Sequence, residues 1–158
     1  MKRVLFVCTG NICRSPLAEA LLKRALAERG LDDVTVASAG TGAWDGAPAS
    51  EGAYLVALER GLDLSSHRAR LLTREIVEET ELILTMARHH RARVHELGGE
   101  GRVFVLGEYA GRTGEEAEVG DPFGGDLEVY RDTCAELEAL IVAVADRLAG
   151  RARSEDRQ

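Results

Sequence analysis

The chain has 158 residues, 45% of them hydrophobic, and a formal net charge of -7. This length suits one domain with a full hydrophobic core, and the negative charge argues against non-specific binding to nucleic acid or an anionic membrane. No apolar run approaches the roughly 18 residues of a membrane span, so we expect no membrane partner and predict a cytoplasmic location.

The cysteines of the chain are Cys8, Cys13 and Cys134, an odd number that does not follow the spacing of a structural zinc site. Secreted domains of this size that depend on disulfides usually carry an even set of cysteines. We therefore expect reduced thiols, any of which could be reactive.

The first half of the chain alternates apolar runs with helical patterns. Residues 4–7 read VLFV, which predicts a strand buried on both faces, and apolar residues then recur at helical spacing until Gly30. Residues 34–37 predict a second strand, and the SAGTG stretch at 38–42 predicts a turn rather than regular structure. Residues 49–60 predict a second helix.

The second half continues this alternation. Thr73 is a plausible cap for a short helix, residues 82–84 predict a third strand, and residues 87–97 predict a helix. Residues 103–106 predict the fourth strand. A polar, glycine-rich loop then leads to Asp126, which can cap a long last helix.

Strands that alternate with helices and read as unbroken apolar runs predict an α/β fold, with a four-stranded parallel sheet and helices on both faces. We predict a single domain over residues 1–150 and a disordered tail at 151–158. Ligands of such sheets bind beyond the carboxyl ends of the strands. The candidate loops are therefore residues 8–15, 38–48, 85–89 and 107–125.

The first of these loops carries the strongest signal, because CTGNICRSP joins the buried first strand to the first helix. Gly10 permits backbone conformations that other residues avoid, and Pro16 suits the first turn of a helix. The free amides of the loop and of the helix start would form a nest with partial positive charge. This pattern predicts a phosphate-binding loop.

A nucleophile and a phosphate clamp share this loop. A cysteine inside an anion cradle should ionise easily, so Cys8 would be a thiolate nucleophile. Arg14 could bind two phosphoryl oxygens with its planar guanidinium. The alternative is that Cys8 is an inert thiol of the core, as most free cysteines are.

These residues resemble the signature of the low-molecular-weight protein tyrosine phosphatases. The likeness covers nearly the whole chain. Its other motifs are SAGT at 38–41, Trp44, SSHRARLL at 65–72 and DPF at 121–123.

The resemblance implies a phosphatase without metal or other cofactor, which acts on phosphorylated protein and holds inorganic phosphate or a related oxyanion in its loop. It assigns Cys8 as the nucleophile that forms a phosphocysteine, Arg14 as the clamp and Asp121 as the general acid and then base. From residue chemistry alone, Asp121 is one of several acids at 115–126, and a charged loop is usually only solvated.

The resemblance also assigns the supporting residues of the site. Ser15 would hydrogen-bond the thiolate, Asn11 would hold the loop in a left-handed turn, and His67 would buttress Asn11. The three histidines of the helix predicted at 87–97, among them His90, are expected to be solvated. The loop that binds phosphate would comprise Thr9, Gly10, Asn11, Ile12, Cys13 and Ser15.

Cys13 stands where many members of that family carry a second thiol beside the nucleophile. We hypothesise that a disulfide between Cys8 and Cys13 inactivates the enzyme reversibly and protects Cys8 from overoxidation. Cys134 is expected to lie in the core.

The substrate pocket is where the chain departs from the eukaryotic pattern. Phe123 stands alone after Asp-Pro, with Gly124 in place of a second aromatic residue, which resembles a bacterial subgroup that includes protein-arginine phosphatases. Those enzymes tend to carry threonine where this chain has Ile12. A branched apolar side chain can pack against a phenyl ring, so Ile12, with Trp44 as the opposite wall, favours phosphotyrosine over phosphoarginine.

Two further functions were considered. An arsenate reductase on the same scaffold would need two more cysteines downstream, and residues 80–95 contain none. A non-catalytic phosphate-binding module would have lost the nucleophile or the acid, and both are present.

Overall fold

The computed structural model describes residues 2–156, with side chains described up to residue 151. Its strands form one parallel sheet in the order β2-β1-β3-β4. The strands are β1 (Lys2–Cys8), β2 (Val34–Gly40), β3 (Leu82–Thr85) and β4 (Val103–Val105). The α/β fold with a four-stranded parallel sheet is confirmed.

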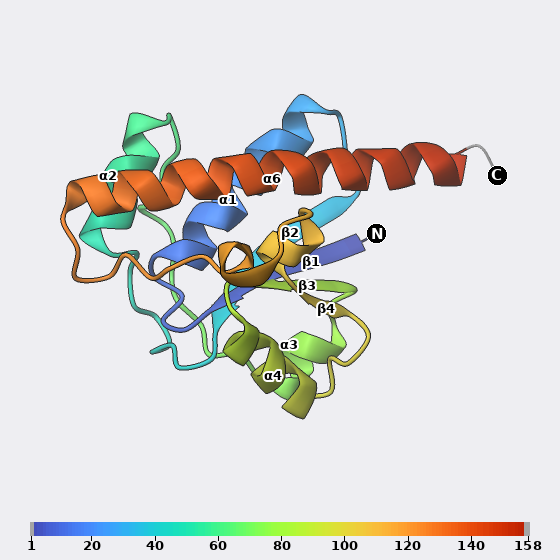
Figure 1. The fold of residues 1–158 in the computed structure, drawn as a ribbon, viewed down its shortest axis with the longest axis horizontal. Helices are drawn as coiled ribbons and strands as arrows, with labels where there is room; N and C mark the ends of the chain where they lie inside the picture. Colours follow the sequence, from blue (N-terminus) through green and yellow to red (C-terminus); the bar gives the residue numbers. More distant parts are fainter. Residues whose placement is uncertain (1, 157–158) are drawn as a thin grey trace.

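Helices cover both faces of this sheet (Figure 1). One face carries α1 (Arg14–Glu28), α2 (Glu51–Glu59) and α6 (Leu127–Asp156), and the other carries α3 (Arg74–Glu78) and α4 (Arg88–Glu96). The short α5 (Leu106–Tyr109) begins at Leu106, which was predicted to end the fourth strand, and α5 and the 3-10 helix η1 (Gly114–Ala117) otherwise lie in the segment predicted to be a loop.

The alternation of side chains along β1 produces two cores. Val4, Phe6 and Cys8 belong to the cluster shared with α1 and α6, whereas Leu5 and Val7 belong to the cluster under α3 and α4. A strand with both faces buried reads as a continuous apolar run, which is why VLFV was diagnostic.

The turn predicted at 38–42 is wrong in part, because Ser38, Ala39 and Gly40 continue β2. They pair with Phe6, Val7 and Cys8 of β1, and this pairing outweighs the turn preference of small residues. The longer strand places Gly40 directly beside Cys8.

The last helix also extends further than predicted. Helix α6 continues to Asp156, so it includes residues 151–156, which were predicted to be a disordered tail. Alanine and arginine favour helix, and Gly150 lies within it at a cost of only about 1 kcal/mol. Residues 157–158 lie outside the described residues. None of the described helices has the length and apolar character needed to cross a membrane.

Candidate functional site

The loop at residues 8–15 lies at the carboxyl end of β1, where the chain crosses to β2 on one side and β3 lies on the other. Ligands bind at such a switch point in open parallel sheets. Gly40 lets the loop pack closely, since a Cβ there would clash with the carbonyl oxygen of Thr9 and lie 3.0 Å from the backbone nitrogen of Asn11.

The loop presents free backbone donors. Within the described part of the chain, the N–H groups of Thr9, Gly10, Ile12 and Cys13 donate no hydrogen bond to a protein acceptor. Backbone N–H groups seldom stay without a partner in a folded protein. Four of them in one turn ahead of a helix form the nest that the sequence predicts, suited to an anion.

The sulfur of Cys8 has two partners in the loop. The backbone N–H of Asn11 donates to Sγ over 3.3 Å, and Ser15 Oγ lies 2.9 Å from it. Ser15 Oγ also accepts a bond of 2.8 Å from Asn11 Nδ2, so its own proton is left for the sulfur. Two donors aimed at one sulfur suit a thiolate.

Asn11 holds the shape of the loop. Its φ of 57° lies in the left-handed region, and the residue is completely buried. Its Oδ1 accepts from the backbone N–H of Arg70 over 2.9 Å, and its carbonyl oxygen lies 2.6 Å from His67 Nε2. Segment 67–70 therefore supports the loop from outside, and His67 lies where the resemblance implies.

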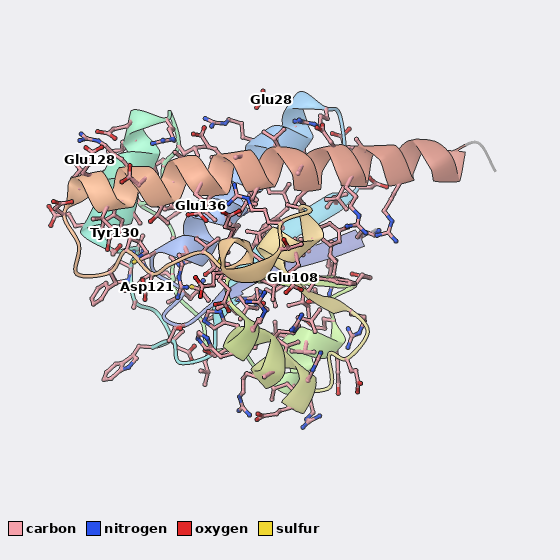
Figure 2. All side chains as sticks on the ribbon, viewed as in Figure 1. Glu28, Glu108, Asp121, Glu128, Tyr130 and Glu136 are labelled. Atoms are coloured by element: carbon pink, nitrogen blue, oxygen red, sulfur yellow. The ribbon has the colours of Figure 1, made fainter. Side chains whose placement is uncertain are left out.

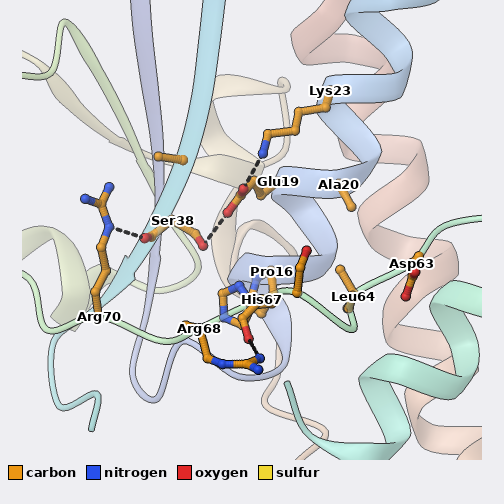
Figure 3. Close-up of a pocket in the computed structure, with 12 residues that line it drawn as sticks. Pro16, Glu19, Ala20, Lys23, Ser38, Asp63, Leu64, His67, Arg68 and Arg70 are labelled. Carbon is orange, nitrogen blue, oxygen red and sulfur yellow. Dashed lines mark hydrogen bonds and ion pairs between the residues drawn. The ribbon is translucent and has the colours of Figure 1, made fainter. Parts of the chain in front are cut away.

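Further polar side chains continue the hydrogen-bond network of Asn11, and Figure 3 shows Ser38, Glu19 and Lys23 joined in a chain. Asn11 Nδ2 donates to Ser38 Oγ over 2.9 Å, and Ser38 donates to Glu19 Oε1 over 2.6 Å. Lys23 pairs with Glu19 at 2.6 Å. Glu19, Lys23 and Ser38 are among the residues that line a cleft of about 380 Å³.

Arg14 is buried, with 5% of its surface exposed, and its guanidinium is only partly satisfied. Nη1 donates to the carbonyl oxygen of Val119 over 2.9 Å. Nε has no partner in the described structure, and Nη2 lies 3.6 Å from Asp121 Oδ2. The edge formed by Nε and Nη2 is the one that binds two oxygens of a phosphate group.

Asp121 lies in the loop between η1 and α6, near the N-terminal end of α6 (Figure 2). Its Oδ1 accepts from the backbone N–H of Phe123 over 3.0 Å, and its Oδ2 faces Arg14. About half of the side chain is exposed. The carboxyl group is therefore aimed at the cradle and still open to water.

The segment before Asp121 is fixed by the backbone. Val119 N–H donates to the carbonyl oxygen of Met86 over 2.9 Å, while the carbonyl oxygen of Val119 accepts from Arg14. Arg14 belongs to the loop at residues 8–15 and also binds the segment that carries the acid.

The three residues predicted to form the walls of the substrate pocket differ in exposure. Ile12 is partly buried, and its side chain lies over Gly10, where a Cβ would be 3.5 Å from Ile12 Cγ1. Trp44 and Phe123 are 84% and 65% exposed. Both aromatic side chains are therefore available to a ligand.

Cys13 faces away from solvent. Its Sγ lies 3.1 Å from Ser50 Oγ and 3.4 Å from the hydroxyl of Tyr130, and burial raises its pKa above the ordinary value. Cys134 is fully buried in the core, as expected.

The expectation for the histidines of α4 is wrong for His90, which is completely buried. Its Nε2 lies 2.9 Å from Thr9 Oγ1, so this histidine of α4 contacts the phosphate-binding loop. His90 and Val94 are the buried residues of α4 and lie one turn apart. That spacing was the available signal, and a run with three histidines and three arginines obscured it.

Among residues 2–156, no three histidine, cysteine or acidic side chains are grouped so that they could hold a metal ion. The groups that the structure brings together at the cradle are Cys8, Arg14, Ser15, Asp121 and the free amides.

Comparison with known proteins adds independent information. Residues 3–154 match the family model described as low molecular weight phosphotyrosine protein phosphatase. A protein-arginine-phosphatase of Bacillus subtilis is 41% identical over 147 residues, which cover 92% of this chain and 95% of that protein. A probable low molecular weight protein-tyrosine-phosphatase, EpsP of Ralstonia solanacearum, is 37% identical over 150 residues, with 94% and 97% covered.

A solved structure of the same family is similar to this chain as well. The arginine phosphatase YwlE, in a mutant with a phosphorylated active site serine, matches with a TM-score of 0.86 at 38% identity. The match covers 92% of this chain and 95% of that one.

Proposed function

The chain belongs to the low molecular weight phosphotyrosine protein phosphatase family, and from this premise we propose that it hydrolyses phosphotyrosine in proteins through a phosphocysteine at Cys8. The observation that carries the proposal is the buried guanidinium of Arg14. One of its nitrogens is held by Val119, and its Nε is left without a partner beside four free amides. A phosphoryl group would satisfy all of these donors.

The first step transfers the phosphoryl group to sulfur. The Cys8 thiolate attacks phosphorus, the bond from phosphorus to the tyrosyl oxygen breaks, and Asp121 gives its proton to that oxygen. Arg14 and the loop amides bind the three equatorial oxygens as charge develops on them.

The second step releases phosphate. Asp121, now a carboxylate, removes a proton from a water molecule that attacks the phosphocysteine, and the bond from sulfur to phosphorus breaks. The thiolate leaves toward the Ser15 hydroxyl, 2.9 Å away, which donates to it. The half-exposed position of Asp121 supports this second role, because water can reach the carboxylate.

Phosphoarginine is the alternative substrate, favoured by the named activity of the Bacillus subtilis relative. Ile12 and the exposed rings of Trp44 and Phe123 support phosphotyrosine instead, because apolar walls suit a phenyl ring better than a guanidinium. Rates on matched peptides that carry phosphotyrosine or phosphoarginine decide between them. We expect the larger kcat/KM on phosphotyrosine, and a preference for phosphoarginine would reject this assignment.

The reaction itself is tested with para-nitrophenyl phosphate. Wild type should turn it over in the presence of a chelator, and Cys8→Ser should not. Rapid denaturation during turnover should trap a covalent phosphoenzyme in wild type and not in Cys8→Ser. Absence of turnover in the folded wild-type protein would favour a phosphate-binding module without catalysis.

We also propose that Cys13 is a redox partner of Cys8. The raised pKa of Cys13 supports a thiol that resolves an oxidised Cys8 rather than one that reacts first. A reducing, cytoplasmic setting would keep both thiols free. Peroxide followed by dithiothreitol should restore activity in wild type and not in Cys13→Ser, and equal recovery would reject the proposal.

A further inference from the structure

His90 contacts the phosphate-binding loop, although it lies on a different helix from every residue assigned to the reaction. It is fully buried at the start of α4, and both of its ring nitrogens have partners. The backbone N–H of Ala87 donates to Nδ1 over 3.1 Å, and Nε2 lies 2.9 Å from Thr9 Oγ1.

These contacts fix the tautomer of the ring. An amide N–H can only donate, so Nδ1 must be the acceptor and the single proton of a neutral imidazole must sit on Nε2. Burial and the nearby charges of His89 and Arg14 lower the pKa of His90 to about 3, which keeps the ring neutral. His90 therefore donates to the Thr9 hydroxyl.

Thr9 is then held from two sides. Its carbonyl oxygen accepts from the N–H of Gly42 over 2.9 Å, and its side chain accepts from His90. Thr9 itself is exposed, follows the nucleophile directly, and contributes one of the free amides of the cradle. The hydroxyl proton of Thr9 is not used in the bond with His90.

We propose that His90 is a positioning residue, which acts through the Thr9 side chain to hold the first amides of the cradle at the geometry that binds the phosphoryl group. This inference deepens the proposed function and rests on it. His90 touches neither the nucleophile nor the acid in any described contact.

The same turn of α4 also holds the acid segment, which gives an internal comparison. Arg88 N–H donates to Glu118 Oε2 over 2.7 Å, and Met86 accepts from Val119. His90 thus binds the cradle, while Glu118 ties the segment before Asp121 to α4. The two contacts can be removed separately.

The test uses two substitutions that each keep one half of the imidazole. In His90→Gln, the amide nitrogen reaches the position of Nε2 and can still donate to Thr9. In His90→Asn, the side-chain oxygen reaches the position of Nδ1 and can still accept from Ala87, but nothing donates to Thr9. Thr9→Val removes the hydroxyl and preserves the shape of the side chain.

Vanadate affinity and kcat/KM on aryl phosphates are measured for all three variants. We expect His90→Asn and Thr9→Val each to weaken both quantities by about three- to tenfold, the size of one hydrogen bond, with no further loss in the double variant. His90→Gln should stay close to wild type. In the His90 and Thr9 variants, the dependence of the rate on the pKa of the leaving group should be unchanged. Glu118→Ala should instead make the rate depend more steeply on the pKa of the leaving group, and it should leave vanadate affinity unchanged.

Thermal unfolding checks each variant for folding. If His90→Asn does not fold, Thr9→Val still decides, because it changes only an exposed residue. Vanadate affinity of Thr9→Val equal to wild type would overturn the inference while wild-type turnover keeps the proposed function. Wild type without turnover would instead reject the proposed function.

Discussion

The loop at residues 8–15 and the aromatic side chains predicted to line the substrate pocket are held in opposite ways. Asn11 and Ser15 are completely buried and joined by hydrogen bonds to each other and to Cys8, whereas Trp44 and Phe123 stand largely in solvent. Transition-state stabilisation needs donors fixed in advance, while substrate selection can use side chains that adapt. The difference implies that changes in the two regions should alter different kinetic quantities.

Asp121 lies between these regions and should give the largest effect on rate. Its carboxyl group faces the buried Arg14 but is itself half-exposed. Asp121→Ala should lower kcat on aryl phosphates by about 10² to 10⁴, as expected for loss of general acid–base catalysis, with vanadate affinity little changed. Asp126→Ser is the matched control, because Asp126 is a carboxylate of the same loop that only caps α6. A similar loss in both variants would reject the role of Asp121.

Asn11 tests how much of the rigidity of the cradle resides in one side chain. Asn11→Ala removes the side-chain hydrogen bonds to Ser15, Ser38 and Arg70. It also places alanine at positive φ, a conformation that asparagine tolerates better. We expect a loss of about 3 kcal/mol in the free energy of unfolding, measured with urea.

Asn11→Gly separates the two causes. It loses the same side-chain bonds but accepts the left-handed conformation, so it should be more stable than Asn11→Ala by about 1 kcal/mol. Equal stability of the two variants would mean that the backbone conformation of residue 11 carries no cost.

The burial of His90 predicts how the stability of the protein depends on pH. Its native pKa of about 3 lies below the ordinary value, chiefly because the ring is buried. Between these values the unfolded chain binds a proton that the native protein does not, so stability must fall as pH falls below about 6.5. Above that pH, His90 makes no contribution to the pH dependence.

The expected size is about 2 kcal/mol between pH 7 and pH 5, taken as the difference between wild type and His90→Asn. Asparagine does not titrate, and the other histidines and the carboxylates are common to both proteins. Parallel stability curves over this pH range would show that the native His90 is protonated normally.

The site could be predicted from the sequence where its signal was local. Cys8, Gly10, Arg14 and Ser15 lie in one loop, and the buried strand before it and the helix start after it, more than the spacing itself, indicated an anion cradle. The same holds for the fold, because buried parallel strands read as continuous apolar runs.

The remainder of the site depends on contacts between distant segments. The bond of His90 to Thr9 spans 81 positions, and the bond of Arg14 to Val119 spans 105. Nothing in the run RHHRARVHE distinguishes a buried histidine from a solvated one except its spacing from Val94. Such partners become visible only when packing places the segments together.

Substitution of Ile12 should give the smallest change in rate, and it tests directly how the exposed region selects the substrate. Its backbone is fixed within the cradle, since its carbonyl oxygen accepts from Ser50 N–H, but its side chain is only partly buried. Ile12→Thr should therefore leave vanadate affinity and unfolding nearly unchanged. It should shift the ratio of kcat/KM for phosphotyrosine and phosphoarginine peptides toward phosphoarginine by about tenfold, the range that one apolar contact allows. Ile12→Val, which keeps a branched apolar side chain, should stay near wild type. If Ile12→Thr instead lowered both rates equally, residue 12 would belong functionally to the rigid cradle, and substrate selection would have to reside in Trp44 and Phe123.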